Sequence, residues 1–153
     1  MKYFMIDGTF REEVVVGVNG FIQGVMEKGG IPGGAQGAKT PSDLLNALPA
    51  IQAQLGLDEA ALVKALPENI RNLGEAIKQH FVYLDTFFAN GTVLFFGPTA
   101  NKLGGMIVFK ANNLAEAEEF VRNDPMVNNG FQTSNIVEFS FGKGQDFVTK
   151  WFD

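Results

Sequence analysis

The chain has 153 residues, of which 46% are hydrophobic, so it is long enough for one packed core but too short for two full domains. Its formal net charge is -5 and its basic residues are scattered, which disfavours nucleic acid and anionic membranes as partners. The absence of cysteine excludes disulfides, thiolate catalysis and cysteine-ligated metal centres.

The beginning of the chain predicts no signal peptide. Only four apolar residues stand between Lys2 and Asp7, whereas the apolar region of a signal peptide needs about 7–15 residues. Polar residues also interrupt every hydrophobic stretch before it reaches the roughly 20 residues that span a bilayer. We therefore expect a soluble, cytoplasmic protein with no membrane partner.

The N-terminal half predicts one strand followed by helices. Aromatic and branched residues over 3–6 end at an Asp-Gly pair, a pattern typical of a strand and a turn. Apolar residues then recur at helical spacing in three segments. The expected elements are a helix over 12–30, a glycine- and proline-rich loop over 31–41, a helix that begins after Thr40 or Ser42 and is kinked or split at Pro49, and a helix from Asp58 to Pro67.

The C-terminal half predicts helices and strands in alternation. One helix is expected to stop at Asn90-Gly91, and another to begin at Asn113, where Glu116 can complete a reciprocal capping arrangement. Asp124-Pro125 is expected to end that second helix. The expected elements are a helix over 75–89, strands over 92–96 and 106–110, a helix from Asn113, a strand over 136–141, and a tail with helical spacing over 147–152.

The order strand, helix, strand, strand, helix, strand predicts an α+β, ferredoxin-like βαββαβ fold with an antiparallel four-stranded sheet. We expect a single domain over 1–153. Its core would comprise 1–10 and 75–141. A helical insert over 11–74 would separate the first strand from the first core helix, and a C-terminal tail would occupy 142–153.

The predicted sheet carries large apolar residues on both faces, as Leu94, Phe95 and Phe96 indicate. Two helices can cover only one of these faces, and an exposed apolar face of this size favours association. A two-fold pair is the commonest symmetric assembly. We therefore expect a homodimer in which a second copy covers the free face.

Four motifs follow one another in the second half. They are His80-Phe81-Val82-Tyr83-Leu84; Asn90-Gly91-Thr92-Val93-Leu94 with Gly97-Pro98; Gly105 followed by Leu114-Ala115-Glu116-Ala117; and Asn123-Asp124-Pro125 with Gly130-Phe131. In this order they resemble the H-x-x-Y-L, G-x-L-L-x-x-G-P, S-L-E-E-A and D-P-x-x-x-x-G-L motifs of the YCII family, in the dimeric α+β barrel group. The resemblance covers 75–141 and the opening strand. The segment 11–74 departs from the family, whose members connect the first strand and first helix directly.

The resemblance implies a pocket whose polar groups are His80 and Asp124, lined also by Tyr83, Gly97 and Pro98. A carboxylate beside an imidazole holds one tautomer and favours the charged ring, as a general base near neutral pH requires. The implied protein is an enzyme of isomerase or lyase type that moves a proton on a small organic molecule. One histidine and no cysteine make a metal site improbable, and no cofactor-binding fingerprint is present, so we expect neither.

Each candidate also has a plain structural interpretation. His80 could be a core histidine bonded to a backbone carbonyl, and Asp124 could merely initiate a turn. The protein would then be a non-catalytic dimeric module that binds a small ligand or is purely structural. The run Gly33 to Thr40 resembles a phosphate-binding loop, but the alanine before Lys39 and the following Pro41 favour a flexible connection, which could act as the hinge of a lid.

Overall fold

The computed structural model of the chain describes residues 1–28 and 40–152. The chain divides into two compact units. One unit, here called the sheet unit, comprises Met1–Thr9 and Ala76–Asp153, and the other, the helical unit, comprises Phe10–Glu75. Most of the expected loop over 31–41, with the phosphate-loop motif and the lid hypothesis, lies outside the described residues.

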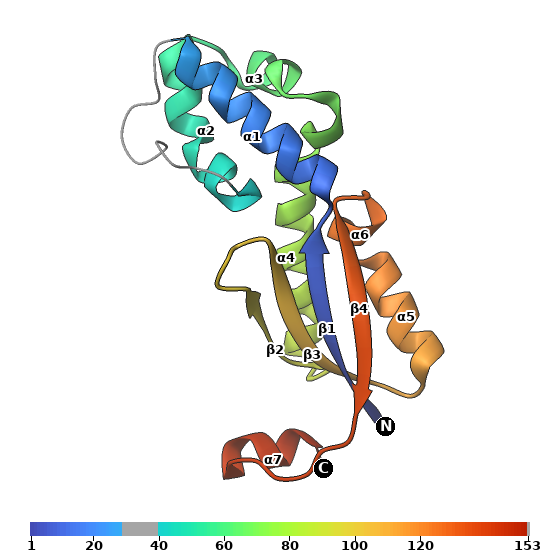
Figure 1. Ribbon diagram of the computed structural model, residues 1–153. Helices are drawn as coiled ribbons and strands as arrows, with labels where there is room; N and C mark the ends of the chain where they lie inside the picture. Colours follow the sequence, from blue (N-terminus) through green and yellow to red (C-terminus); the bar gives the residue numbers. More distant parts are fainter. Residues whose placement is uncertain (29–39, 153) are drawn as a thin grey trace. The chain divides into compact units, whose positions relative to one another are not determined.

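The sheet unit is built on four strands in the order β2-β3-β1-β4, which is the order of a ferredoxin-like fold. β3 pairs antiparallel with both β1 and β2, and Figure 1 shows β4 running opposite to β1. The strands are β1 (Lys2–Phe10), β2 (Val93–Pro98), β3 (Gly104–Ala111) and β4 (Gln132–Phe139). The prediction of an α+β, ferredoxin-like fold is confirmed.

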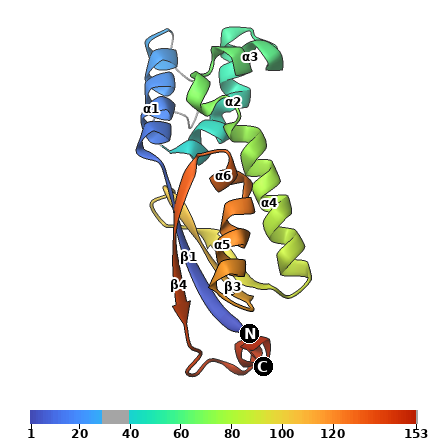
Figure 2. The same ribbon diagram turned by 90° about the vertical axis from the view of Figure 1, so that its right-hand side faces the viewer.

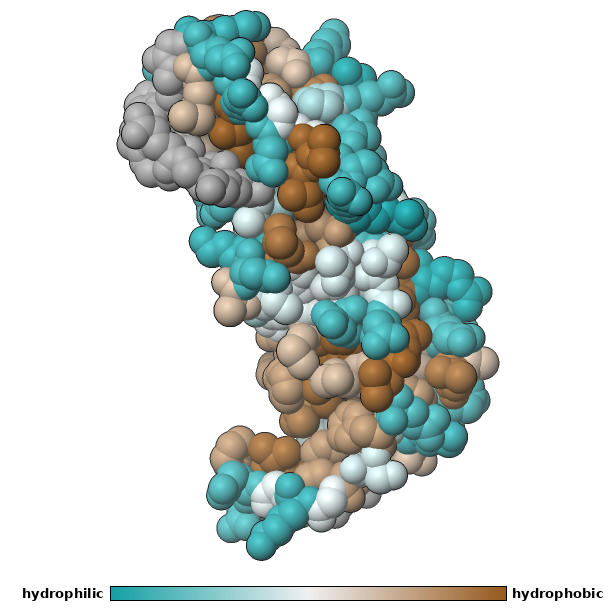
Figure 3. Space-filling model, in the orientation of Figure 1, coloured by the Kyte–Doolittle hydropathy of each residue, from teal (hydrophilic) through white to brown (hydrophobic). Residues whose placement is uncertain are grey.

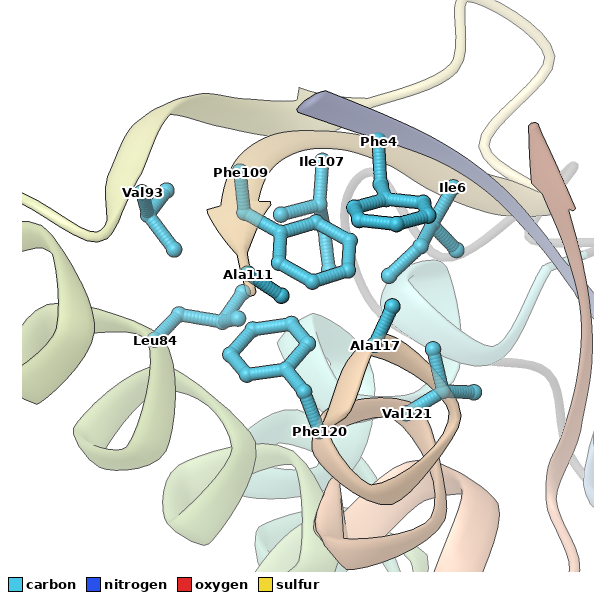
Figure 4. Packing of buried hydrophobic residues seen from close by; sticks show 10 residues of the cluster. All are labelled: Phe4, Ile6, Leu84, Val93, Ile107, Phe109, Ala111, Ala117, Phe120 and Val121. Carbon is cyan, nitrogen blue, oxygen red and sulfur yellow. The ribbon is translucent and has the colours of Figure 1, made fainter. Parts of the chain in front are cut away.

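Two helices, α4 (Leu73–Ala89) and α5 (Leu114–Asn123), lie on one face of this sheet (Figure 2). Every second strand residue points to that face, because side chains alternate along a strand. The rings of Phe109 and Phe120 stack there with their centroids 4.4 Å apart. The buried cluster that joins sheet and helices contains Phe4, Ile6, Leu84, Val93, Ile107, Phe109, Ala111, Ala117, Phe120 and Val121 (Figure 4).

The predicted signals at the ends of these helices are present. Gly91 follows α4 with a φ of 80°, a left-handed conformation that costs glycine little. The side chain of Asn113 accepts a hydrogen bond from the amide of Glu116 and so caps α5. The return bond differs from the prediction, because the carboxylate of Glu116 accepts from the amide of Asn112 instead of that of Asn113.

Three strands differ clearly from their predicted bounds, while β3 extends the expected 106–110 by two residues at its start and one at its end. β1 continues through the expected turn at Asp7-Gly8, because both residues pair with β3, Gly8 opposite Gly105. β2 includes Gly97-Pro98, and a proline is tolerated there because β2 is an edge strand. β4 begins and ends earlier than the expected 136–141, and the short helix α6 (Pro125–Asn128) precedes it.

The helical unit contains α1 (Glu12–Glu27), α2 (Pro41–Leu55), α3 (Glu59–Ala65) and the single 3-10 turn η1 (Glu68–Ile70). Thr40 is the N-cap of α2, and it exchanges hydrogen bonds with Asp43 in a capping box. The helix continues through Pro49 without being split. The helix expected over 12–30 is present as α1, and its buried side chains are Val14, Val18, Ile22 and Val25, which recur at helical spacing.

The tail forms α7 (Asp146–Phe152), which packs against the face of the sheet opposite to α4 and α5. Tyr3 and Lys110 are paired across β1 and β3, and their side chains alternate with those of the buried cluster. The hydroxyl of Tyr3 donates to the carbonyl of Phe152. The ammonium of Lys110 lies over the ring of Trp151, 4.9 Å from its centroid. α7 therefore covers one end of this second face.

A substitution at Gly104 tests the close approach of the β1 and β3 backbones at this position. A Cβ atom at Gly104 would lie 1.8 Å from the carbonyl oxygen of Gly8, so the two backbones would have to separate. We expect Gly104→Ala to lower the free energy of unfolding by about 3 kcal/mol, measured by urea denaturation. Gly97→Ala is the matched control, because a Cβ there meets no atom within 4 Å. Equal stability of the two variants would contradict this close approach.

Candidate functional site

His80 lies in the middle of α4, on the side of the helix that packs into the sheet unit. Ala76 and Leu84, one turn before and one turn after it, are both buried, while Phe81 and Val82 are half or more exposed. The His80 side chain is 18% exposed. The imidazole therefore lies largely out of water, where a polar ring needs a partner.

That partner is Asp124, which stands between α5 and α6. Its backbone is extended, so it ends α5 and begins α6, and Pro125 at the first position of α6 favours this turn. One oxygen of its carboxylate accepts a hydrogen bond from the amide of Met126 at 2.9 Å. The side chain is 7% exposed. The predicted turn-initiating role of Asp124 is therefore present, and the same carboxylate has a second role.

The carboxylate of Asp124 also binds the ring of His80. Nδ1 of His80 lies 2.7 Å from one oxygen and 2.9 Å from the other. A carboxylate can only accept, so Nδ1 carries the proton and donates it. In the neutral form of the ring Nε2 therefore carries no proton, and no residue in the part of the chain that the structure describes bonds this nitrogen. Such a nitrogen is able to take up a proton.

Tyr83 lies three residues after His80 on α4, and its hydroxyl donates to the carbonyl of Phe120 at 2.9 Å. Burial, followed by the negative charges of Asp124 and Glu119, raises the pKa of Tyr83 from 10.0 to about 12. The hydroxyl therefore stays protonated through the neutral range. It serves as a hydrogen-bond donor there and not as a base.

Tyr83 also lines a pocket of about 390 Å³. This pocket is bordered by α4, α5 and the end of β3, and neither His80 nor Asp124 is among its lining residues. Gly97 and Pro98 lie instead at the end of β2, opposite Met106 and Gly105 of β3. The structure thus brings His80 and Asp124 into contact, with Tyr83 on the same helix. A lining role for Gly97 and Pro98 stays a prediction.

Two partners of this site were not found in the sequence. They are the carbonyl of Phe120 and the amide of Met126. Both are backbone groups, and the type of a residue does not indicate whether its backbone takes part in a site. The Asp124-Pro125 pair could have indicated the second of these, because an N-cap aspartate commonly accepts from an amide two residues on. Among the described residues, no group of three or more His, Cys, Asp and Glu could hold a metal ion.

The sequence matches the YCII-related domain over residues 59–140, which is more than half of the chain. The chain belongs to the YCII-related family. No curated protein matches the sequence. One similar solved structure is 5-chloro-2-hydroxyhydroquinone dehydrochlorinase from Burkholderia phenoliruptrix AC1100 in complex with 2,5-dihydroxybenzoquinone, at 17% identity and a TM-score of 0.43, over 92% of this chain and 95% of that chain. A likeness this weak carries no argument about the reaction.

The YCII-related match contains all five residues that the sequence motifs singled out: His80, Tyr83, Gly97, Pro98 and Asp124. It begins within the expected insert, and the opening strand lies outside it. The family assignment from the motifs is confirmed for the second half of the chain. No described helix of this YCII-related protein is long and apolar enough to cross a membrane.

The two roles of Asp124 can be separated by substitution. Asp124→Ala leaves the amide of Met126 and the ring of His80 without an acceptor in a buried place, so we expect the free energy of unfolding to fall by about 2–4 kcal/mol. Asp124→Asn keeps an N-cap oxygen and should cost about 1 kcal/mol. Urea denaturation measures both. The control is Asp85→Ala, which removes an exposed carboxylate of α4. An equal fall in the free energy of unfolding for the two Asp124 variants would contradict the capping role.

Proposed function

We propose that this YCII-related protein is an enzyme that abstracts a proton from a small organic molecule and returns it elsewhere, as an isomerase or a lyase does. His80 is the acid/base group and Asp124 orients it. The observation that carries this proposal is the hydrogen bond from Nδ1 of His80 to both oxygens of Asp124. It fixes the tautomer in which Nε2 can act as a general base.

The proposed step moves one proton and one electron pair. Nε2 of His80 takes a proton from a carbon of the substrate, and the electron pair of that C–H bond moves toward an adjacent carbonyl. The ring becomes an imidazolium between the substrate and the carboxylate of Asp124, whose negative charge stabilises it. Return of the proton to a different carbon completes an isomerisation. Loss of a leaving group from the neighbouring carbon, with transfer of the proton from the imidazolium to that group, completes an elimination.

We also propose that the chain pairs with a second copy through the sheet face that α4 and α5 leave free. Tan and brown surface lies over the sheet in Figure 3, which views this face. Met5 and Phe95 both lie opposite Val108 of β3, so the three side chains share the face. Phe95 is 51% exposed and Met106 38% exposed. α7 covers the end near Tyr3, and the apolar surface continues beyond it.

Proton exchange tests the proposed chemistry without knowledge of the natural substrate. Small carbonyl compounds and aromatic acids are incubated with the protein in D₂O, and the loss of a C–H signal is followed by proton NMR. For any compound that exchanges, we expect His80→Gln to slow exchange roughly 10²-fold or more, and Asp124→Asn at least roughly tenfold. The control Asp85→Asn removes an exposed carboxylate of the same helix and should exchange like the unmodified protein.

Two results would contradict the enzyme proposal. One is exchange that continues unchanged in His80→Gln. The other is binding of a compound, seen as shifted amide signals, without exchange of any of its protons. The second result would favour a binding module, and the pocket beside Tyr83 would then be its first candidate site.

Met106→Glu tests the proposed pairing. A carboxylate on the free face would have to be buried against the second copy, which costs several kcal/mol unless it is paired. We expect a dimer for the unmodified chain and a monomer for Met106→Glu in analytical ultracentrifugation. Met26→Glu is the control, because Met26 is similarly exposed (42%) but belongs to α1 in the helical unit. A monomeric unmodified chain, or a dimeric Met106→Glu, would contradict the assignment of this face.

A further inference from the structure

The carbonyl of Phe120 has lost its helical partner. In a continuous helix it would accept from the amide four residues later, which belongs to Asp124. The chain turns at Asp124, however, and that amide bonds the carbonyl of Val121 at 3.2 Å. The carbonyl of Phe120 is therefore one of the acceptors that a helix leaves free where it ends. The hydroxyl of Tyr83 occupies it, at 2.9 Å.

This bond attaches α4 to the last turn of α5, immediately before the residue that orients the base. His80 and Tyr83 are three residues apart, so they stand on the same side of α4, one turn from each other. The two helices are therefore joined by two polar bonds, His80 to Asp124 and Tyr83 to the carbonyl of Phe120. Apolar packing of Phe120 and Val121 holds α5 against the sheet, and the bond from Tyr83 adds a polar restraint on the turn that carries the carboxylate.

The ring of Tyr83 is held separately from its hydroxyl. Its centroid lies 4.9 Å from that of Phe87 and 5.3 Å from that of Phe120. These contacts involve the ring alone and would be retained by phenylalanine. Because the hydroxyl stays protonated through the neutral range, it can donate to the carbonyl at every pH at which His80 would work.

We propose that Tyr83 is a positioning residue, which holds the end of α5 so that Asp124 keeps His80 in its Nδ1-protonated form. This proposal extends the proposed function, because the orientation of His80 matters for proton transfer. The role assigned to Tyr83 is indirect. The hydroxyl of Tyr83 affects the imidazole of His80 only through the last turn of α5 and the carboxylate of Asp124.

The test is Tyr83→Phe, which removes the hydroxyl and keeps the ring. The chain has one histidine, so its ring nitrogen shifts in ¹⁵N NMR report the tautomer of His80 without overlap. We expect the share of the Nδ1-protonated form to fall in Tyr83→Phe and to fall further in Asp124→Asn. For an exchanging compound, the loss of one neutral hydrogen bond should lower kcat about fivefold, with a smaller change in KM.

The matched control is Tyr3→Phe, which removes the hydroxyl of the only other tyrosine. That hydroxyl bonds the carbonyl of Phe152 in α7, and we expect the tautomer of His80 to stay unchanged. A double-variant cycle then separates positioning from general stability. If Tyr83 acts through Asp124, adding Tyr83→Phe to Asp124→Asn should change neither the tautomer nor kcat further.

An unchanged tautomer in Tyr83→Phe, or an equal change in Tyr3→Phe, would overturn the proposal. A loss of stability with the tautomer retained would also overturn it, because the bond to Phe120 would then be purely structural. The tautomer measurement does not depend on turnover. If His80→Gln leaves exchange unchanged, the proposed chemistry fails, while the NMR result still decides the role of Tyr83.

Discussion

The buried carboxylate of Asp124 is the constraint on which the site depends. A carboxylate removed from water must be hydrogen-bonded, and this one accepts from the amide of Met126 and from Nδ1 of His80. Its location is set by the turn in which α5 ends and α6 begins. The ring is thus oriented by a carboxylate whose place is set by the backbone of another element.

The two helices that carry the pair are held to the sheet by apolar packing and to each other by polar bonds at their ends. The rings of Phe109 and Phe120 and the side chain of Leu84 belong to the buried cluster. His80 lies one turn before Leu84 on α4, and there a polar contact with Asp124 replaces the apolar packing. A polar pair is tolerated at this place because the first turn of α6 supplies a free backbone amide, that of Met126, which the middle of a helix does not.

Most of the fold could be predicted from local signals. Helix caps and the spacing of apolar residues depend only on residues that are close in the sequence. Asn113 and Gly91 marked helix ends correctly. The turn expected at Asp7-Gly8 failed, since pairing with β3 outweighs the local preference and only the tertiary structure shows it. His80 and Asp124 could be paired only through the family motifs, as 44 residues separate them. The acceptor of Tyr83 is a backbone carbonyl, which no side-chain pattern reveals.

The proposed chemistry and the proposed pairing use opposite faces of the sheet. His80 and Asp124 belong to the helices on one face, whereas Met106 and α7 lie on the other. No bond of the pair crosses the sheet among the described residues. A change that dissolves the dimer should therefore leave the tautomer of His80 as it is, unless the second copy reaches around to the helix side. Oligomeric state and tautomer, measured on the same variants, distinguish a site complete in one chain from one that two chains share.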